Sequence, residues 1–225
     1  MRPLIEIHGL KKSLGGRQVL DIPELIIEKG SRLAVIGPNG CGKTTLLRIL
    51  SGVLAPDEGE VIINTEKISY MPQKPYYFGF SVYKNVAMAV KNRENVGEKV
   101  SAALSAVGLS ELREKRGGNL SGGEAQRMAF ARVLVGDGEL LLLDEPSSAA
   151  DIAGTALMEN ALKKLLSQGE RTIVFTTHAP AEAAALGREI MVMSKGEIAE
   201  RGEAGQVLYD PKSERAAAFL SHWRL

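Results

Sequence analysis

The feature that most constrains the fold is a short apolar run that ends in a glycine-rich loop. Residues 32–36, RLAVI, form a hydrophobic segment with the length of a buried strand. The eight residues GPNGCGKT follow at positions 37–44, and apolar residues then recur at helical spacing from Thr44 to Leu50. This order predicts a strand, a tight loop and a helix, which is the setting of a phosphate-binding loop in an α/β fold.

The loop contains the residue types that anion binding requires. Its glycines let backbone N–H groups turn inward without a Cβ in the way. The helix that follows directs its positive end at the same point. We expect Lys43 to reach the β- and γ-phosphates of a nucleotide and the hydroxyl of Thr44 to bind Mg²⁺. The motif also fits a kinase or a GTPase, so it predicts nucleotide binding without identifying the reaction.

The composition is typical of a soluble globular chain. The 225 residues are 44% hydrophobic and 24% charged, which suits one domain or one domain with an inserted subdomain. Lys and Arg number 28 and Asp and Glu 27, so the net charge of +1 gives no electrostatic argument for nucleic acid as the main partner. The single cysteine excludes an internal disulfide. No secretory signal or membrane-spanning run is expected.

Strand and helix patterns alternate on both sides of a helical stretch. Turns are expected at Gly15-Gly16 and Lys195-Gly196, and helices within 81–136 and from Thr155 to Leu166. Strands are expected over residues 4–7, 19–27, 32–36, 60–63, 68–71, 140–143, 172–176, 190–193 and 198–199. The alternation predicts an α/β sheet with parallel strands.

Two acidic residues end the most apolar of these strands. Residues 140–145 read LLLLDE, so Asp144 and Glu145 are expected at the sheet edge beside the phosphate loop. Asp144 is placed to hold Mg²⁺, directly or through water, and Glu145 to polarise an attacking water. Alone, such a pair is more often an ordinary strand end with solvated acids. The phosphate loop makes the functional interpretation the better one.

Two further polar residues follow strands at the same predicted edge. Gln73 comes after the strand at 68–71, and His178 after the strand at 172–176. A lone glutamine or histidine there is usually structural, and these two matter only because they are expected close to Asp144. His178 could then hydrogen-bond the γ-phosphate, and Gln73 could sense Mg²⁺ or the attacking water.

The run LSGGE at 120–124, followed by AQR, completes the set of motifs. It predicts a helix N-terminus in which Ser121 and Glu124 form a capping box, and it also suits a second anion site. Together with the other motifs, it resembles the ABC ATPase family across essentially the whole chain. Kinases and GTPases lack this signature, and the chain has no N-K-x-D guanine motif.

The resemblance implies a site shared between two subunits that face each other head to tail. The signature residues Ser121, Gly122, Gly123 and Glu124 would then act on the nucleotide of the partner, and Ser147 to Asp151 would be a loop that crosses the dimer. Gln73 would be a hinge and would also reach the metal with Thr44 and Asp144, while Glu145, His178 and Gln73 would be the catalytic set. The residues implied to contact ATP are Leu14, Gly37, Pro38, Asn39, Gly40, Cys41, Gly42, Lys43, Thr44, Thr45 and Asp151.

The sequence departs from the family pattern at three positions. Leu14 stands where an aromatic residue usually stacks on adenine, so the base would gain only apolar contact. Ala150 replaces the usual leucine of the crossing loop. Cys41 replaces a common serine, and a thiol among N–H donors at a helix start could have a lowered pKa. On that hypothesis alkylation of Cys41 would block activity and ATP would protect it; otherwise Cys41 is a small buried residue without special reactivity.

The resemblance also implies the fold and its divisions. The expected class is α/β, a P-loop NTPase three-layer core with an N-terminal antiparallel β subdomain and an inserted α-helical subdomain. Residues 1–225 would be one ABC ATPase domain. Within it, 1–80 and 137–204 would form the core, 81–136 the signature-bearing helical subdomain, and 205–225 a helical tail.

The function implied is an ATP-hydrolysing subunit that powers transport through partner transmembrane permease subunits. A bacterial importer is favoured, working with a substrate-binding protein at the cytoplasmic side of the inner membrane. The stretch 71–87 looks like the importer region that meets a membrane partner, and is especially similar to subunits for tungstate, molybdate or phosphate-like oxyanions. The alternative is a soluble ABC ATPase without a transport role, such as an iron–sulfur assembly type.

Overall fold

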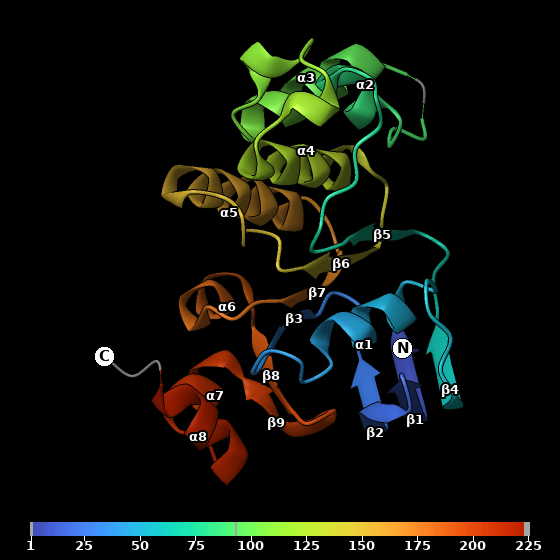
Figure 1. The fold of residues 1–225 in the computed structure, drawn as a ribbon, viewed down its shortest axis with the longest axis vertical. Coiled ribbons are helices and arrows are strands. Elements are labelled where there is room, and N and C mark those ends of the chain that lie inside the picture. Colours follow the sequence, from blue (N-terminus) through green and yellow to red (C-terminus); the bar gives the residue numbers. More distant parts are fainter. Residues whose placement is uncertain (1, 93, 223–225) are drawn as a thin grey trace.

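A three-stranded antiparallel sheet forms from the N-terminal part of the chain (Figure 1). In the computed structural model, which describes residues 2–92 and 94–222, β1 (Ile5–Leu14) lies between β2 (Arg17–Ile27) and β4 (Glu58–Ile63). The strand β1 is longer than the sequence predicts. Its apolar alternation stops at His8, but pairing with β2 continues to the turn at Gly15-Gly16.

A second sheet of six strands carries the candidate site. Its order is β5-β6-β7-β3-β8-β9, and all neighbours are parallel except the hairpin of β8 and β9. The strands are β5 (Ile68–Met71), β6 (Leu140–Asp144), β7 (Thr172–Thr176), β3 (Arg32–Ile36), β8 (Glu189–Ser194) and β9 (Glu197–Glu203). The predicted parallel sheet is therefore confirmed. Since β5, β6, β7 and β3 run in one direction, the residues that follow them meet at one edge.

Alternation along the central strands divides the core between the two faces of this sheet. On one face Leu33, Val35 and Leu142 pack with α1 (Lys43–Leu50) and with the inner face of the antiparallel sheet. On the other face Ile36, Leu143 and the neighbouring alternate residues pack with helices. Such strands, buried on both faces, read as continuous apolar runs, which is why LLLL at 140–143 gives so clear a signal.

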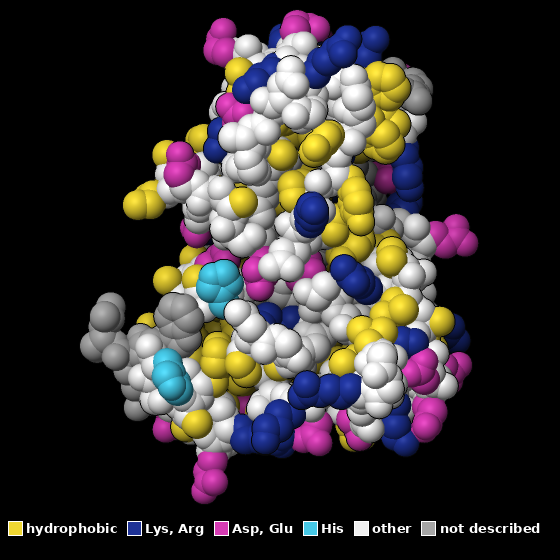
Figure 2. Space-filling view, viewed as in Figure 1, with side chains coloured by type: hydrophobic (Ala, Val, Ile, Leu, Met, Phe, Trp, Pro, Cys, Tyr) yellow, Lys and Arg dark blue, Asp and Glu magenta, His cyan; other side chains and the backbone are white. Residues whose placement is uncertain are grey.

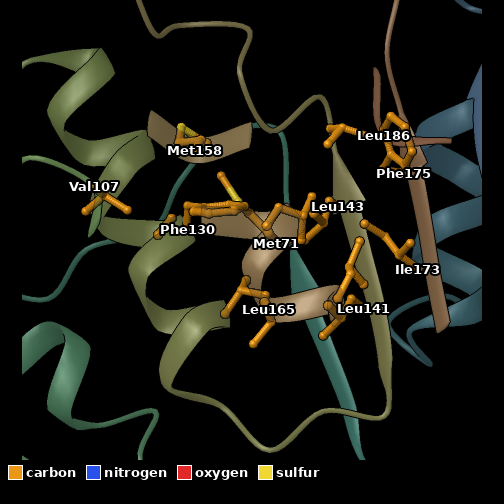
Figure 3. Packing of buried hydrophobic residues seen from close by; sticks show 14 of the residues in the cluster. Met71, Val107, Phe130, Leu141, Leu143, Met158, Leu165, Ile173, Phe175 and Leu186 are labelled. Atoms are coloured by element: carbon orange, nitrogen blue, oxygen red, sulfur yellow. The ribbon is translucent and has the colours of Figure 1, made fainter. Parts of the chain in front are cut away.

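Helices stack over the second face and extend away from it (Figure 1). The helix α4 (Gly122–Val135) packs between α5 (Ile152–Ser167) below and the pair α2 (Val82–Ala87) and α3 (Val96–Ala106) above. Two short 3₁₀ turns, Ser110–Leu112 and Gly117–Asn119, connect α3 to α4. Figure 3 shows Phe130 of α4 beside Met71, Leu143 and Met158, so the helical stretch and the sheet share one core.

Three further helices complete the fold. These are α6 (Pro180–Leu186), α7 (Ala204–Tyr209) and α8 (Glu214–Ser221). The helix α6 was not predicted, although Pro180 at its first turn and the alanines after it favour a helix start and a helix. None of the helices in the described part of the chain has both the length and the apolar character needed to span a bilayer.

We predict that Phe130→Ala destabilises the fold by about 3–5 kcal/mol, because it leaves a cavity where α4 meets the sheet. Phe130 is 1% exposed, whereas Ile152 is 92% exposed. The control Ile152→Ala should therefore stay within about 0.5 kcal/mol of the parent. Urea unfolding measures both free energies. A loss below about 1 kcal/mol for Phe130→Ala would contradict the packing described here.

Candidate functional site

The phosphate loop lies between β3 and α1 and requires glycine at both ends. Gly37 has φ 150°, and a Cβ there would lie 2.2 Å from the carbonyl oxygen of Met193. Gly42 has φ 109°, and its Cβ would lie 2.7 Å from the carbonyl oxygen of Val19. Any side chain at either position would clash with these carbonyl groups and displace the loop from β8 and β2. The glycines therefore allow the loop to pack against the β-strands as well as to bind an anion.

Lys43 opens α1 with its ammonium group turned back onto the loop. Its Nζ donates to the carbonyl oxygens of Gly37, at 2.7 Å, and Pro38, at 3.2 Å, and the residue is 6% exposed. A charge held this close to the loop and to the positive end of α1 makes the loop strongly attractive to phosphate oxygens. Contact of Lys43 with the β- and γ-phosphates of a nucleotide stays a prediction.

Asp144 joins the phosphate loop to the sheet. Its Oδ1 accepts hydrogen bonds from the hydroxyl of Thr44, at 3.1 Å, and from that of Thr176 on β7, at 2.7 Å. Its Oδ2 is buried and has no hydrogen-bond partner among the described residues. A buried carboxylate oxygen without a partner is costly, and a hard divalent cation is the ligand that best satisfies it. Thr44 and Asp144 therefore have the chemistry to hold Mg²⁺, and their role as its ligands stays a prediction.

Glu145 is held from several sides in a strained conformation. Its φ of 48° lies in the left-handed region, which costs of order 1–3 kcal/mol for a residue other than glycine. Its backbone N–H donates to Thr176 Oγ1 at 2.9 Å, and its carbonyl oxygen accepts from Gln126 Nε2 at 2.9 Å. Its Oε2 accepts from Gln73 Nε2 at 2.9 Å and lies 3.6 Å from His178 Nδ1, too far for a hydrogen bond.

The predicted convergence of Gln73, His178 and Glu145 with the phosphate loop is therefore present. All of them line one cavity of about 670 Å³, a volume suited to a small-molecule ligand. Its lining residues are Val19, Gly37, Pro38, Asn39, Gly40, Gly42, Lys43, Thr44, Thr45, Gln73, Glu145, His178 and Phe219. The cavity contains most of the nucleotide-contacting residues expected from the sequence.

Three of the expected contacts, Leu14, Cys41 and Asp151, do not line this cavity, and two unexpected residues do. Leu14 ends β1 at the hairpin turn and is 44% exposed, while Cys41 is buried under the loop. Val19 of β2 and Phe219 of α8 provide apolar wall instead. Val19 follows the Gly15-Gly16 turn, but no pattern in the sequence connects the C-terminal helix with the phosphate loop.

The lowered pKa expected for Cys41 is wrong. The side chain is 4% exposed, and burial raises the pKa of its thiol above the ordinary value, although the nearby charge of Lys43 acts in the opposite direction. The thiol is thus protonated near neutral pH and is not an activated nucleophile. Cys41 is the small buried residue that the alternative interpretation described.

The signature residues form the predicted capping box at the start of α4. Ser121 Oγ accepts from the N–H of Glu124 at 3.2 Å, and Glu124 Oε2 accepts from the N–H of Ser121 at 2.8 Å. Lys115 Nζ lies 3.0 Å from the same carboxylate oxygen, and these contacts, the backbone one foremost, hold the pKa of Glu124 below its ordinary value. Ser121 and Gly122 are exposed and lie outside the phosphate cavity of their own chain.

Gln126 connects the signature helix to the rest of the site, a role that its sequence position did not reveal. Its fully buried amide donates to the carbonyl oxygen of Glu145 and to Ser148 Oγ, and accepts from the N–H of Ala149 at 2.6 Å. Asp151 caps α5 by accepting from Gly154 N–H at 2.7 Å. The loop from Ser147 to Asp151 is therefore fixed against α4.

Comparisons with known proteins agree on one family. The family model described as ABC transporter matches residues 20–148, more than half of the chain. The spermidine/putrescine import ATP-binding protein PotA of Bacteroides fragilis is 35% identical over 97% of this chain. The chain spans 51% of that protein and 63% of the PotA of Haemophilus influenzae.

Two solved structures share the fold, and one of them is also similar in sequence. A metal-chelate type ABC transporter in an inward-facing conformation has a TM-score of 0.79 and 30% identity, covering 98% of this chain and 90% of that one. A bacterial Atm1-family ABC exporter with ATP bound has a TM-score of 0.87, covering 100% of this chain and 42% of that one. At 24% identity this second match concerns the fold alone.

Proposed function

The chain belongs to the ABC transporter family, and on that basis we propose that it hydrolyses ATP to power transport through partner membrane subunits. Members of this family are ATPases that bind ATP with Mg²⁺. The observation that carries the proposal is one cavity lined by both the phosphate loop and a positioned Glu145, with Asp144 bonded to Thr44 of that loop. A phosphate loop alone would support binding; a carboxylate held beside it supports hydrolysis.

We propose the following division of work among the residues. The loop N–H groups and Lys43 would bind the phosphates. Thr44 and Asp144 would hold Mg²⁺, which would supply positive charge to offset the negative charge of the phosphates. The Glu145 carboxylate accepts a proton from a water whose oxygen attacks the γ-phosphorus, while the bond from that phosphorus to the ADP oxygen breaks. Gln73 holds Glu145 in place through its 2.9 Å hydrogen bond. His178 lies beside the same carboxylate and would hydrogen-bond the γ-phosphate.

We further propose that two copies of the chain, or this chain and a paired ABC subunit, complete each site. The signature residues support this, because Ser121 and Gly122 are exposed at a helix start yet lie outside the cavity of their own chain. A facing subunit would bring them to the γ-phosphate, as the family resemblance implies, and Asp151 would lie near the crossing. Gln126 would then couple dimer closure to the position of Glu145, because it contacts both the crossing loop and the backbone of Glu145.

An exposed aromatic surface supports docking to a permease. Tyr76, Tyr77, Phe78 and Phe80 are between 49% and 73% exposed, which is unusual for four aromatic residues so close in sequence. Figure 2 shows hydrophobic side chains gathered over the upper part of the visible face. The backbone of the aromatic segment is bonded to the fully buried Asn85. The Asn85 amide donates to the carbonyl oxygens of Phe78 and Phe80 at 3.1 and 3.0 Å. We propose this surface as the contact with a transmembrane subunit.

The cargo suggested by the relatives differs from the one suggested by the sequence. The expectation of a tungstate-, molybdate- or phosphate-like oxyanion is not supported, because the relatives described above are named for spermidine and putrescine import. We propose import of that polyamine class in place of oxyanions. The iron–sulfur assembly alternative is not favoured by these names.

Association with the cytoplasmic side of the inner membrane, through the permease and beside a substrate-binding protein, stays part of the proposal. So does the division into core (1–80 and 137–204), helical subdomain (81–136) and tail (205–225).

We predict that Glu145→Gln retains ATP binding but lowers the hydrolysis rate by about 10²–10⁴-fold, because the amide cannot accept the proton of the attacking water. Phosphate release measures the rate and titration calorimetry the affinity. Glu170→Gln, at an exposed position before β7, is the matched control and should hydrolyse ATP like the parent. Near-parental turnover in Glu145→Gln would show that another group is the base.

We predict that Ser121→Arg binds ATP normally and fails to form the ATP-dependent dimer, because the larger cation would occupy the place of the facing γ-phosphate. Size-exclusion chromatography in the Glu145→Gln background, where ATP persists, measures the dimer. Ser101→Arg on the exposed face of α3 is the control and should dimerise. Dimerisation of Ser121→Arg equal to that control would rule out the proposed contact in trans.

A further inference from the structure

The helices α3, α4 and α5 lie one above another (Figure 1). Residues of all three line a second hollow, and none of its lining residues belongs to the phosphate cavity. Its volume is about 420 Å³, within the range of about 300–1,000 Å³ that small-molecule pockets occupy. One wall comes from α3 and the end of α4, and the other from the last turns of α5. The hollow therefore spans the junction between the helical stretch and the helix that covers the sheet.

Small side chains create this space. Ala102, Ala103 and Ala106 of α3 line the hollow, and so does Ala161 of α5. Since each of these side chains ends at Cβ, the two helices leave a gap that longer residues would have filled. Leu134 and Leu165 complete an apolar floor. A hydrophobic body fits such a surface without leaving polar groups unsatisfied.

The rim of the hollow is positively charged. Lys91, Lys99, Lys164 and Arg171 line it, and Asp137 is the one acidic residue among its lining. Asp137 lies 3.3 Å from Lys91 Nζ, so that pair cancels and three cations remain. In a chain with a net charge of only +1, this is a local concentration of one sign over an apolar floor.

Arg171 adds an observation that points to a ligand. Its Nη1 is buried and has no hydrogen-bond partner among the described residues. A buried guanidinium nitrogen without an acceptor is costly, since arginine donors are almost always paired. An anionic group in the hollow would supply the acceptor once the side chain turned toward it.

Helix ends account for only part of this charge. The last turns of α4 and α5 reach the hollow at Val135 and Leu165, and each carries about half a negative charge that cations commonly offset. Two such ends amount to about one charge. Three uncompensated cations exceed that by about two, which is enough to favour a ligand with one or two negative charges.

We propose that this hollow binds a small amphipathic anion. Its apolar body would lie among the alanines, and its carboxylate, sulfonate or phosphate would face Lys164 and Arg171. Because the walls belong to α3 and α4 on one side and to α5 on the other, the bound anion would hold the helical stretch in place over the sheet. The proposal goes beyond ATP hydrolysis and does not depend on it.

The test uses 8-anilinonaphthalene-1-sulfonate as the anionic probe, with its fluorescence as the measure of binding to the full chain. Lys164→Gln should weaken binding about threefold to fivefold, the range of a partly exposed charge pair. Lys163→Gln is the matched control, because Lys163 is the neighbouring residue on α5 but lies outside the hollow and pairs with Glu159. The control should bind like the parent. Equal weakening by both substitutions would overturn the proposal.

Two further measurements locate the probe. Ala106→Leu fills the hollow from a half-buried position and should remove the component of binding that Lys164→Gln weakens. N-phenyl-1-naphthylamine, the same body without the sulfonate, should bind the parent and Lys164→Gln equally. Unchanged sulfonate binding in Ala106→Leu would place the probe elsewhere, for example on the exposed aromatic surface, and would overturn the proposal. So would an equal loss of both probes in Lys164→Gln.

Discussion

One buried carboxylate connects the elements on which the site depends. Asp144 ends β6, and its Oδ1 accepts hydrogen bonds from Thr44 at the start of α1 and from Thr176 at the end of β7. These two bonds fix the helix of the phosphate loop to the central sheet. They also leave Oδ2 buried without a partner among the described residues, an arrangement that a divalent cation would stabilise. The anion site and the cation site are thus built from the same few atoms.

The strain at Glu145 follows from this anchoring. With Asp144 fixed, the chain turns sharply, and Glu145 takes a φ of 48° that its neighbours enforce. The neighbours include Gln126, which also contacts the loop from Ser147 to Asp151. The proposed base, the crossing loop and the signature helix therefore form one connected hydrogen-bond network. A movement of the signature helix would therefore reach the backbone of Glu145 through Gln126.

The sequence predicts the phosphate edge well because its signals are local. Strand, loop and helix are contiguous around Lys43, and residues that follow parallel strands must meet at one edge, so Gln73 and Glu145 could be brought together without coordinates. Contacts between distant segments could not be predicted from the sequence. Phe219 reaches the cavity only through the packing of α8, and burial outweighs the loop's N–H groups in raising the pKa of the Cys41 thiol. Tertiary packing, which leaves no local pattern, decided both.

The central claim is that Asp144, together with Thr44, holds the Mg²⁺ that accompanies a bound nucleotide. Its most direct test compares the affinity for ATP, with Mg²⁺ and with the metal chelated, in the parent and in Asp144→Asn by titration calorimetry. We expect Mg²⁺ to tighten ATP binding to the parent and expect this gain to be lost in Asp144→Asn. The same gain in both proteins would contradict it.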